Sequence, residues 1–178
     1  MIGDELFKYE LVRGVLIVNP PPAESQRGPN ELLGYRLLDY REHHPQGASL
    51  DATIYNEYMR VESGWRIADR AVWAGLGRHP RPPRDVPAIA VDFPSSLTCD
   101  RRRDYIDKRR EYLEAGVREY WIIDRFRRSM TVCRTGTPDV LVKEQETDRT
   151  DLLPGFELPL AVLLEEADRA RQGEEDAS

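Results

Sequence analysis

Three residues, Asp69, Asp92 and Lys108, are of the types that hydrolyse a phosphate ester when a fold brings them together. Two carboxylates supply the hard oxygen ligands that Mg²⁺ binds in proteins. A bound Mg²⁺ polarises a phosphoryl group and lowers the pKa of a water molecule. The ammonium group of Lys108 would orient that water and stabilise the charge that develops on the phosphate.

The spacing of these residues along the chain does not select that chemistry by itself. Acidic residues are common at the ends of strands and in turns. The simpler interpretation is that Asp92 begins a turn and that Asp69 pairs with an arginine. From spacing alone, this structural interpretation is the preferred one.

The segments around Asp92 and Lys108 predict a strand, a helix and a second strand. The apolar run 87–93 (PAIAVDF) contains Asp92 near its end, and 119–124 (EYWIID) is a second apolar run. Between them we expect a charged helix over 101–115 that makes a right-handed crossover between parallel strands. Lys108 falls roughly 100° from the middle of the apolar stripe of this helix. We therefore expect its side chain at the edge of the buried face.

Asp69 lies in a run of residues that predicts a strand. Ile67, Asp69 and Ala71 would share one face of a strand over 65–75, which a short turn joins to a strand over 48–61. If Ile67 and Ala71 face inward, the carboxylate of Asp69 also points toward the interior. That position is costly unless the carboxylate is paired or coordinated.

The remaining chain predicts a hairpin at the start and two more helices. Residues 7–18 form two apolar strands around Arg13-Gly14, where glycine accommodates a positive φ. We expect one helix over about 30–43, opened by Pro29, and another near the C-terminus. The predicted fold is α/β: a mixed, mostly antiparallel central sheet flanked by helices, with an N-terminal β-hairpin.

The composition fits one domain, which we expect over 1–167, followed by an acidic tail over 168–178 without regular structure. The net charge of −6 argues against a protein that coats nucleic acid through bulk charge. No signal peptide and no apolar run near the roughly 20 residues that cross a bilayer is visible, so we expect a cytoplasmic protein that does not bind membranes. Cys99 and Cys133 fit reduced thiols and are too few for a zinc site.

Two groups of basic residues are candidates for contacts with phosphates. Arg101, Arg102 and Arg103 begin the predicted helix, but acidic neighbours three and four residues away favour a solvated helix face. Arg125 and Arg127 follow the second apolar strand and have fewer acidic neighbours. They are therefore the better candidates.

Four segments together resemble the Uma-two type restriction endonucleases, a family of the PD-(D/E)XK nuclease superfamily. They are IADRAV (67–72), PAIAVDFPSS (87–96), a helix with Asp104, Lys108 and Tyr112 at four-residue intervals, and AGVREYWIID (115–124). The opening YELVRGVLIVNPPP (9–22) is also similar, so the resemblance covers most of residues 7–165. It implies a restriction-endonuclease-like fold and cleavage of DNA with Mg²⁺ or Mn²⁺. A homodimer would be the natural way to cut both strands.

The resemblance assigns roles to the candidate residues. Asp69 matches the aspartate of the family's first motif, and Asp92 stands where the family usually has a glutamate. Lys108 matches a lysine relocated to the helix, because Pro94 occupies its usual place. Glu31, in the first helix, corresponds to an auxiliary acidic residue of some superfamily members. Asp69 and Asp92 would therefore hold the metal and Lys108 would position the attacking water, with Glu31 assisting.

The sequence departs from the family pattern at three places, and the shortened Asp92, together with the overall acidity, supports a rival hypothesis. Ala68 replaces the proline of the first motif, Asp92 has one methylene fewer than glutamate, and Gln26, Arg27 and Gly28 stand where the family has a histidine. A metal displaced by about an ångström lowers the rate by as much as about 10²-fold. The alternative function is a catalytically degenerate nuclease fold that binds nucleic acid or a protein partner without cleavage. A third hypothesis is hydrolysis of a different phosphodiester at the same site.

Overall fold

The computed structural model describes residues 7–95 and 103–176. Within these residues an eight-stranded sheet has the order β2-β1-β4-β5-β6-β7-β8, with β3 paired to β4. The strands are β1 (Lys8–Val12), β2 (Val15–Asn19), β3 (Leu50–Val61), β4 (Gly64–Ala74), β5 (Ile89–Asp92), β6 (Glu119–Asp124), β7 (Ser129–Cys133) and β8 (Val140–Lys143). A second, two-stranded sheet pairs β9 (Thr147–Arg149) with β10 (Glu157–Pro159).

The large sheet is mixed and mostly antiparallel, as predicted, with β5 and β6 as its parallel pair among the described strands. The connection between these two strands holds a π-helical turn, η2 (Arg103–Lys108), that continues into the helix α3 (Arg109–Glu114). The predicted helix over 101–115 is therefore present, but its first described turns are wider than an α-helix.

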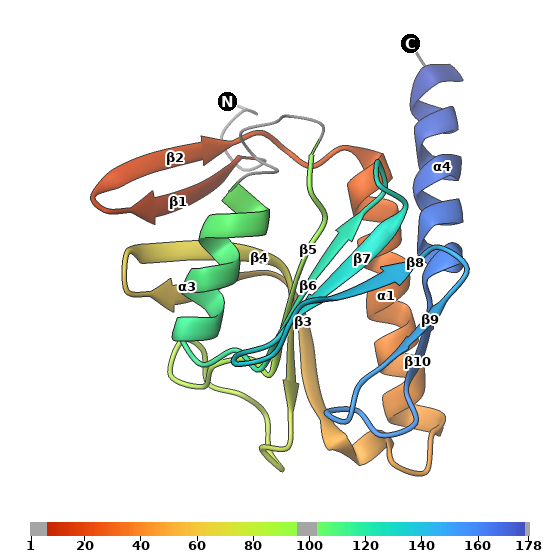
Figure 1. Cartoon of the computed structure of the whole chain (residues 1–178), viewed down its shortest axis with the longest axis horizontal. Coiled ribbons are helices and arrows are strands. Elements are labelled where there is room, and N and C mark those ends of the chain that lie inside the picture. The colour runs from red at the N-terminus through yellow and green to blue at the C-terminus, as the bar shows by residue number, and fades with distance from the viewer. Residues whose placement is uncertain (1–6, 96–102, 177–178) are drawn as a thin grey trace.

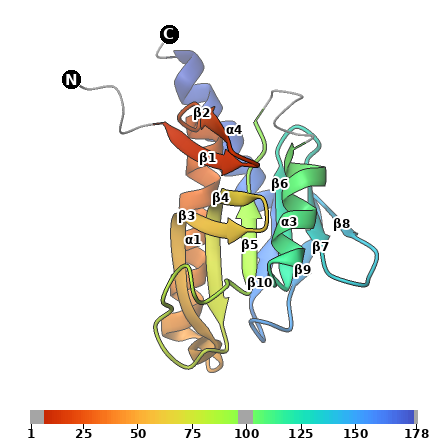
Figure 2. The same cartoon turned by 90° about the vertical axis from the view of Figure 1, so that its left-hand side faces the viewer.

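Both faces of the central strands are buried. Figure 1 shows α3 on one face of the sheet, and Figure 2 shows α1 (Glu24–His43) and α4 (Leu160–Asp176) on the other. Ala90 and Ile122 pack in the apolar cluster on the α3 side, whereas Val91 and Trp121 pack in the cluster that includes α1 and α4. This alternation explains why β5 and β6 are continuous apolar runs in the sequence.

The first helix begins earlier than predicted. Helix α1 starts at Glu24, and Pro29 lies inside it rather than at its first position. Gln26 caps this start, because its side-chain Oε1 accepts a hydrogen bond of 3.1 Å from the backbone N–H of Ala23. Ser25 and Pro29 are buried, so packing stabilises a helical turn in a segment for which the sequence predicts a loop.

The end of the chain also differs from the prediction. Helix α4 continues to Asp176, so the segment 168–178 is helical over its described residues instead of lacking regular structure. Two contacts account for this: Asp168 pairs with Arg128 at 2.9 Å, and Gly28 of α1 lets α4 approach at Ala170. No helix of the described residues combines the length and the apolar character needed to span a bilayer.

Candidate active site

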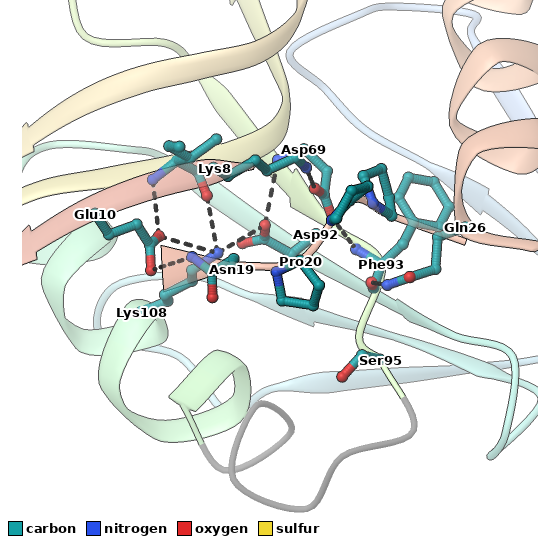
Figure 3. Close-up of a pocket in the computed structure, with 13 residues that line it drawn as sticks. Lys8, Glu10, Asn19, Pro20, Gln26, Asp69, Asp92, Phe93, Ser95 and Lys108 are labelled. Carbon is teal, nitrogen blue, oxygen red and sulfur yellow. Dashed lines mark hydrogen bonds and ion pairs between the residues drawn. The ribbon is translucent and has the colours of Figure 1, made fainter. Parts of the chain in front are cut away.

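A small pocket lies where the N-terminal hairpin meets β4, β5 and η2 (Figure 3). Its volume is about 80 Å³. The pocket is lined by Lys8, Glu10, Asn19, Pro20, Pro21, Pro22, Gln26, Ile67, Asp69, Asp92, Phe93, Ser95 and Lys108. Asp69, Asp92 and Lys108 are therefore at one place.

The two aspartates are neighbours across a pair of antiparallel strands. Arg70 of β4 pairs with Val91 of β5, which places Asp69 and Asp92 opposite each other at the end of that ladder. The backbone N–H of Asp69 donates to Asp92 Oδ1 at 3.2 Å. The N–H of Phe93 in turn donates to Asp69 Oδ2 at 2.8 Å. Backbone hydrogen bonds thus hold both carboxylates side by side.

Lys108 reaches this pair from the helix, as its position at the edge of the buried face predicted. Its Nζ donates to Asp92 Oδ1 at 3.0 Å and to the carbonyl oxygen of Ile67 at 2.8 Å. The residue is only 5% exposed, and Tyr120 Oη donates to Asp92 Oδ2 at 2.8 Å. The ammonium and the carboxylate are therefore fixed in position before any ligand binds.

The hairpin supplies two pocket residues, Lys8 and Glu10, that the sequence pattern did not predict. Lys8 Nζ lies 2.7 Å from Asp69 Oδ1, and Glu10 accepts a hydrogen bond of 2.9 Å from the N–H of Ile67. Both residues alternate along β1, so they share one face of that strand. The alternation is visible in the sequence, but the pairing of β1 with β4 that turns this face toward Asp69 is not.

A network of buried ion pairs lies next to the pocket and connects β1, β4 and α3. Arg66 Nε lies 2.6 Å from Glu111 Oε2, and Arg66 Nη1 lies 3.5 Å from Glu10 Oε2. Burial works to lower the pKa of Arg66, but its hydrogen bond to Glu111 and the negative charge of Glu10 raise the pKa overall. Glu10 also lies 3.7 Å from Lys108 Nζ. This network fixes α3 against β4 and so fixes the direction from which Lys108 enters.

Glu31, the predicted auxiliary acid, does not line the pocket. Its side chain is 71% exposed and lies 3.9 Å from Arg27. Gln26 occupies the pocket instead and donates from Nε2 to the carbonyl oxygen of Phe93 at 2.7 Å. Glu31 is five residues further along α1, about 140° around the helix, and so faces away.

Comparison with known proteins identifies the family. The profile of the Uma2 family, described as "Putative restriction endonuclease", matches residues 3–161. The chain belongs to the Uma2 family. A crystal structure described as a putative nuclease belonging to DUF820 from Anabaena variabilis ATCC 29413 has the same fold, with a TM-score of 0.72 and 15% identity over 89% of this chain and 90% of that one. No curated protein matches the sequence.

The pocket of this Uma2 protein has a donor set that suits Mg²⁺ or Mn²⁺. The described residues contain no cluster of three or more histidine, cysteine, aspartate or glutamate side chains that would form a closed metal cage. Mg²⁺ usually binds through one or two carboxylates and keeps water and phosphate oxygens as its other ligands. Each oxygen of Asp69 accepts one hydrogen bond from the described residues, and a carboxylate has about four acceptor sites in all. Asp69 and Asp92 therefore fit such a cation.

The predicted phosphate contacts separate into two groups. Arg101 and Arg102 lie outside the described residues, as does the side chain of Arg103. The guanidinium group of Arg125 stacks on Phe126, 4.2 Å from the ring centroid.

Arg127 differs from its neighbour Arg128 in the same turn. The side chain of Arg127 is 62% exposed, and its guanidinium group lies 4.8 Å from the ring centroid of Tyr105 on η2. Arg128 is tied to Glu144 and Asp168. Of these two side chains, that of Arg127 is the more available to solvent.

Proposed function

We propose that this Uma2 protein is an endonuclease that hydrolyses phosphodiester bonds of DNA and requires Mg²⁺ or Mn²⁺. One observation carries the proposal: the Lys108 ammonium lies 3.0 Å from Asp92 Oδ1, beside Asp69, in a pocket at the end of β5. The family description and the nuclease described for the Anabaena variabilis structure agree with this reaction class.

Asp69 and Asp92 are the residues that would hold the cation. When bound, a divalent cation supplies a Lewis acid for the phosphoryl oxygen and lowers the pKa of a bound water. The short side chain of Asp92 is sufficient to reach the pocket, because Tyr120 and Lys108 hold its two oxygens from opposite sides. The loss of one methylene relative to glutamate does not withdraw the carboxylate from the site.

Lys108 would orient the attacking water and stabilise negative charge on the phosphate. Its ammonium is held by Asp92 and by the carbonyl oxygen of Ile67, so little reorganisation is needed during the reaction. Glu10, 3.7 Å away and 1% exposed, favours the charged form of the lysine. The role of Glu10 is therefore to maintain the charge of Lys108.

The lining of the pocket indicates which part of DNA it accepts. Lys8, Lys108 and the two aspartates line it. These charged groups suit a phosphate oxygen with a cation and water. The site would therefore act on the backbone, with any sequence recognition elsewhere on the surface.

Cleavage of supercoiled plasmid tests the proposal. Purified protein should nick or linearise the plasmid with Mg²⁺ or Mn²⁺, and EDTA should stop the reaction. Asp69→Asn should abolish cleavage, whereas Asp39→Asn, on the exposed surface of α1, should leave it unchanged. Metal-independent cleavage, or full activity in Asp69→Asn, would contradict the proposed site.

A nuclease fold that binds DNA without cutting it is the second candidate. The observation that favours it is that Lys8 and Lys108 already neutralise the two aspartates without a metal. In that case the plasmid would be retarded in a gel but never cut, even by Asp92→Glu, which restores the family's usual glutamate.

A further inference from the structure

Lys8 forms a contact that the proposed reaction does not yet explain. Its Nζ lies 2.7 Å from Asp69 Oδ1, with the side chains 15% and 19% exposed. The ammonium is therefore bound to the carboxylate that would hold the cation. A positive group at this position competes with a metal ion for the same oxygen.

The distribution of lysines suggests that this contact is specific to the site. The chain contains three lysines and 23 arginines, and two of the three lysines line the pocket. Next to the pocket, the buried ion pair between Arg66 and Glu111 uses arginine instead. Lysine differs from arginine in having a compact charge on a flexible stem, which can change partners within a small volume.

We propose that Lys8 is a second lysine of the active site and acts as a mobile counter-ion. Without a cation its ammonium neutralises Asp69; when a divalent cation binds Asp69, the ammonium leaves the carboxylate and contacts a non-bridging oxygen of the substrate phosphate. The inference rests on the proposed function, because it assumes that Asp69 binds the cation.

The surroundings of Lys8 permit this exchange. Its stem belongs to β1, which pairs with β4 through only two residue pairs, Leu11 with Trp65 and Val12 with Gly64. Its Nζ also lies 5.8 Å from the ring centroid of Tyr55 on β3. The aromatic face offers the ammonium a second favourable position once Asp69 is occupied.

Binding of Mn²⁺, measured by electron paramagnetic resonance of the free ion, tests the proposal without any substrate. Lys8→Met keeps the length of the side chain and removes its charge, and Lys143→Met makes the same change on exposed β8. Lys8→Met should bind Mn²⁺ about two- to fivefold more tightly than Lys143→Met, because a competing ion pair of modest strength is lost. Equal or weaker binding in Lys8→Met, with each variant folded by circular dichroism, would overturn the role of Lys8.

Acetylation of the wild-type chain gives a second measurement that needs no variant. Acetic anhydride should modify Lys8 more extensively when Mg²⁺ is present, while Lys143 should not change, and mass spectrometry resolves the three lysines. Unchanged labelling of Lys8 under conditions where Mn²⁺ binding is measured would overturn the exchange.

The outcomes separate this proposal from the proposed function. Tight Mn²⁺ binding in Lys8→Met without any plasmid cleavage by the wild type would support the competition and reject the nuclease. Cleavage with unchanged Mn²⁺ affinity in Lys8→Met would reject Lys8 alone. Absence of Mn²⁺ binding in both the wild type and Lys8→Met would reject both.

Discussion

The two ends of the parallel strands β5 and β6 each hold a buried carboxylate, but they are built differently. At the carboxyl end, Asp92 contacts a lysine, and the pocket lies beside it. At the amino end, Glu119 accepts hydrogen bonds from Arg134, Thr150 and Trp121 at 2.9, 3.0 and 2.9 Å. The carboxylate of Asp92 also accepts three hydrogen bonds, from Lys108, Tyr120 and the N–H of Asp69, but it lines the pocket and has a lysine among its donors.

This difference separates a structural carboxylate from a candidate catalytic one. Arginine and tryptophan present planar, rigid donors that hold Glu119 in one geometry. The pocket combines lysines with carboxylates whose oxygens have further acceptor capacity. In open α/β sheets, ligands bind outside the carboxyl ends of parallel strands, and the pocket follows that rule.

The largest expected effect is on Lys108. Lys108→Met should lower the rate of plasmid cleavage by about 10²–10³-fold, because a fixed charge beside the reacting phosphate is lost. Lys143→Met is the control and should cleave at the wild-type rate. Quantifying the loss of supercoiled plasmid over time measures both. A Lys108→Met variant that is folded and retains more than a tenth of the activity would remove the distinction between the two ends.

Glu119→Gln should show the opposite pattern. The amide cannot keep every charge-assisted hydrogen bond, so the free energy of unfolding should fall by about 1–3 kcal/mol. At urea concentrations below the unfolding transition, the rate of plasmid cleavage should stay near that of the wild type. Urea denaturation followed by circular dichroism gives the stability. A loss of activity without a loss of stability would place Glu119 in the catalytic machinery.

Asp148, near Glu119, should make stability depend on pH. Burial, followed by the negative charge of Glu119, raises the pKa of Asp148 from 3.8 to about 6, and its Oδ2 has no hydrogen-bond partner among the described residues. The folded state therefore binds this proton more tightly than the unfolded state does, and stability is lost as the pH rises from the ordinary pKa of 3.8 to about 6.

Asp148→Asn should stabilise the protein at pH 7.5 by about 1–2 kcal/mol, less than the full shift implies because solvent screens part of the charge. The wild type should gain this stability as the pH falls from about 7 toward 4, and the variant should lack that component. Urea unfolding at several pH values compares the two proteins. A variant with the same pH dependence as the wild type would show that Asp148 is not the responsible group.

The sequence was sufficient to predict three residues that meet in the pocket but not the residues at the margin of the pocket. Asp69 and Asp92 lie at positions that strand alternation and the family resemblance predict, and the helical period places Lys108 at a buried edge. Lys8 and Gln26 depend on the pairing of β1 with β4 and on a helix that begins before Pro29. Both features are tertiary effects. The strand pairing joins segments far apart in the sequence, and packing stabilises a helix that contains Pro29, although the local sequence predicts that the helix starts there.

The smallest expected effect concerns two of the three arginines in the turn after β6, at the carboxyl end of that strand. Arg127→Gln should weaken DNA binding by about two- to fivefold and leave stability unchanged, because an exposed phosphate contact contributes little. Arg128→Gln should leave DNA affinity nearly unchanged but lower the free energy of unfolding, since Arg128 holds Glu144 and Asp168. Fluorescence anisotropy with labelled duplex at several salt concentrations, beside urea unfolding, measures both quantities. The reverse assignment, with Arg128→Gln reducing the salt dependence of binding, would move the DNA-binding surface toward α4 and away from the carboxyl end of β6.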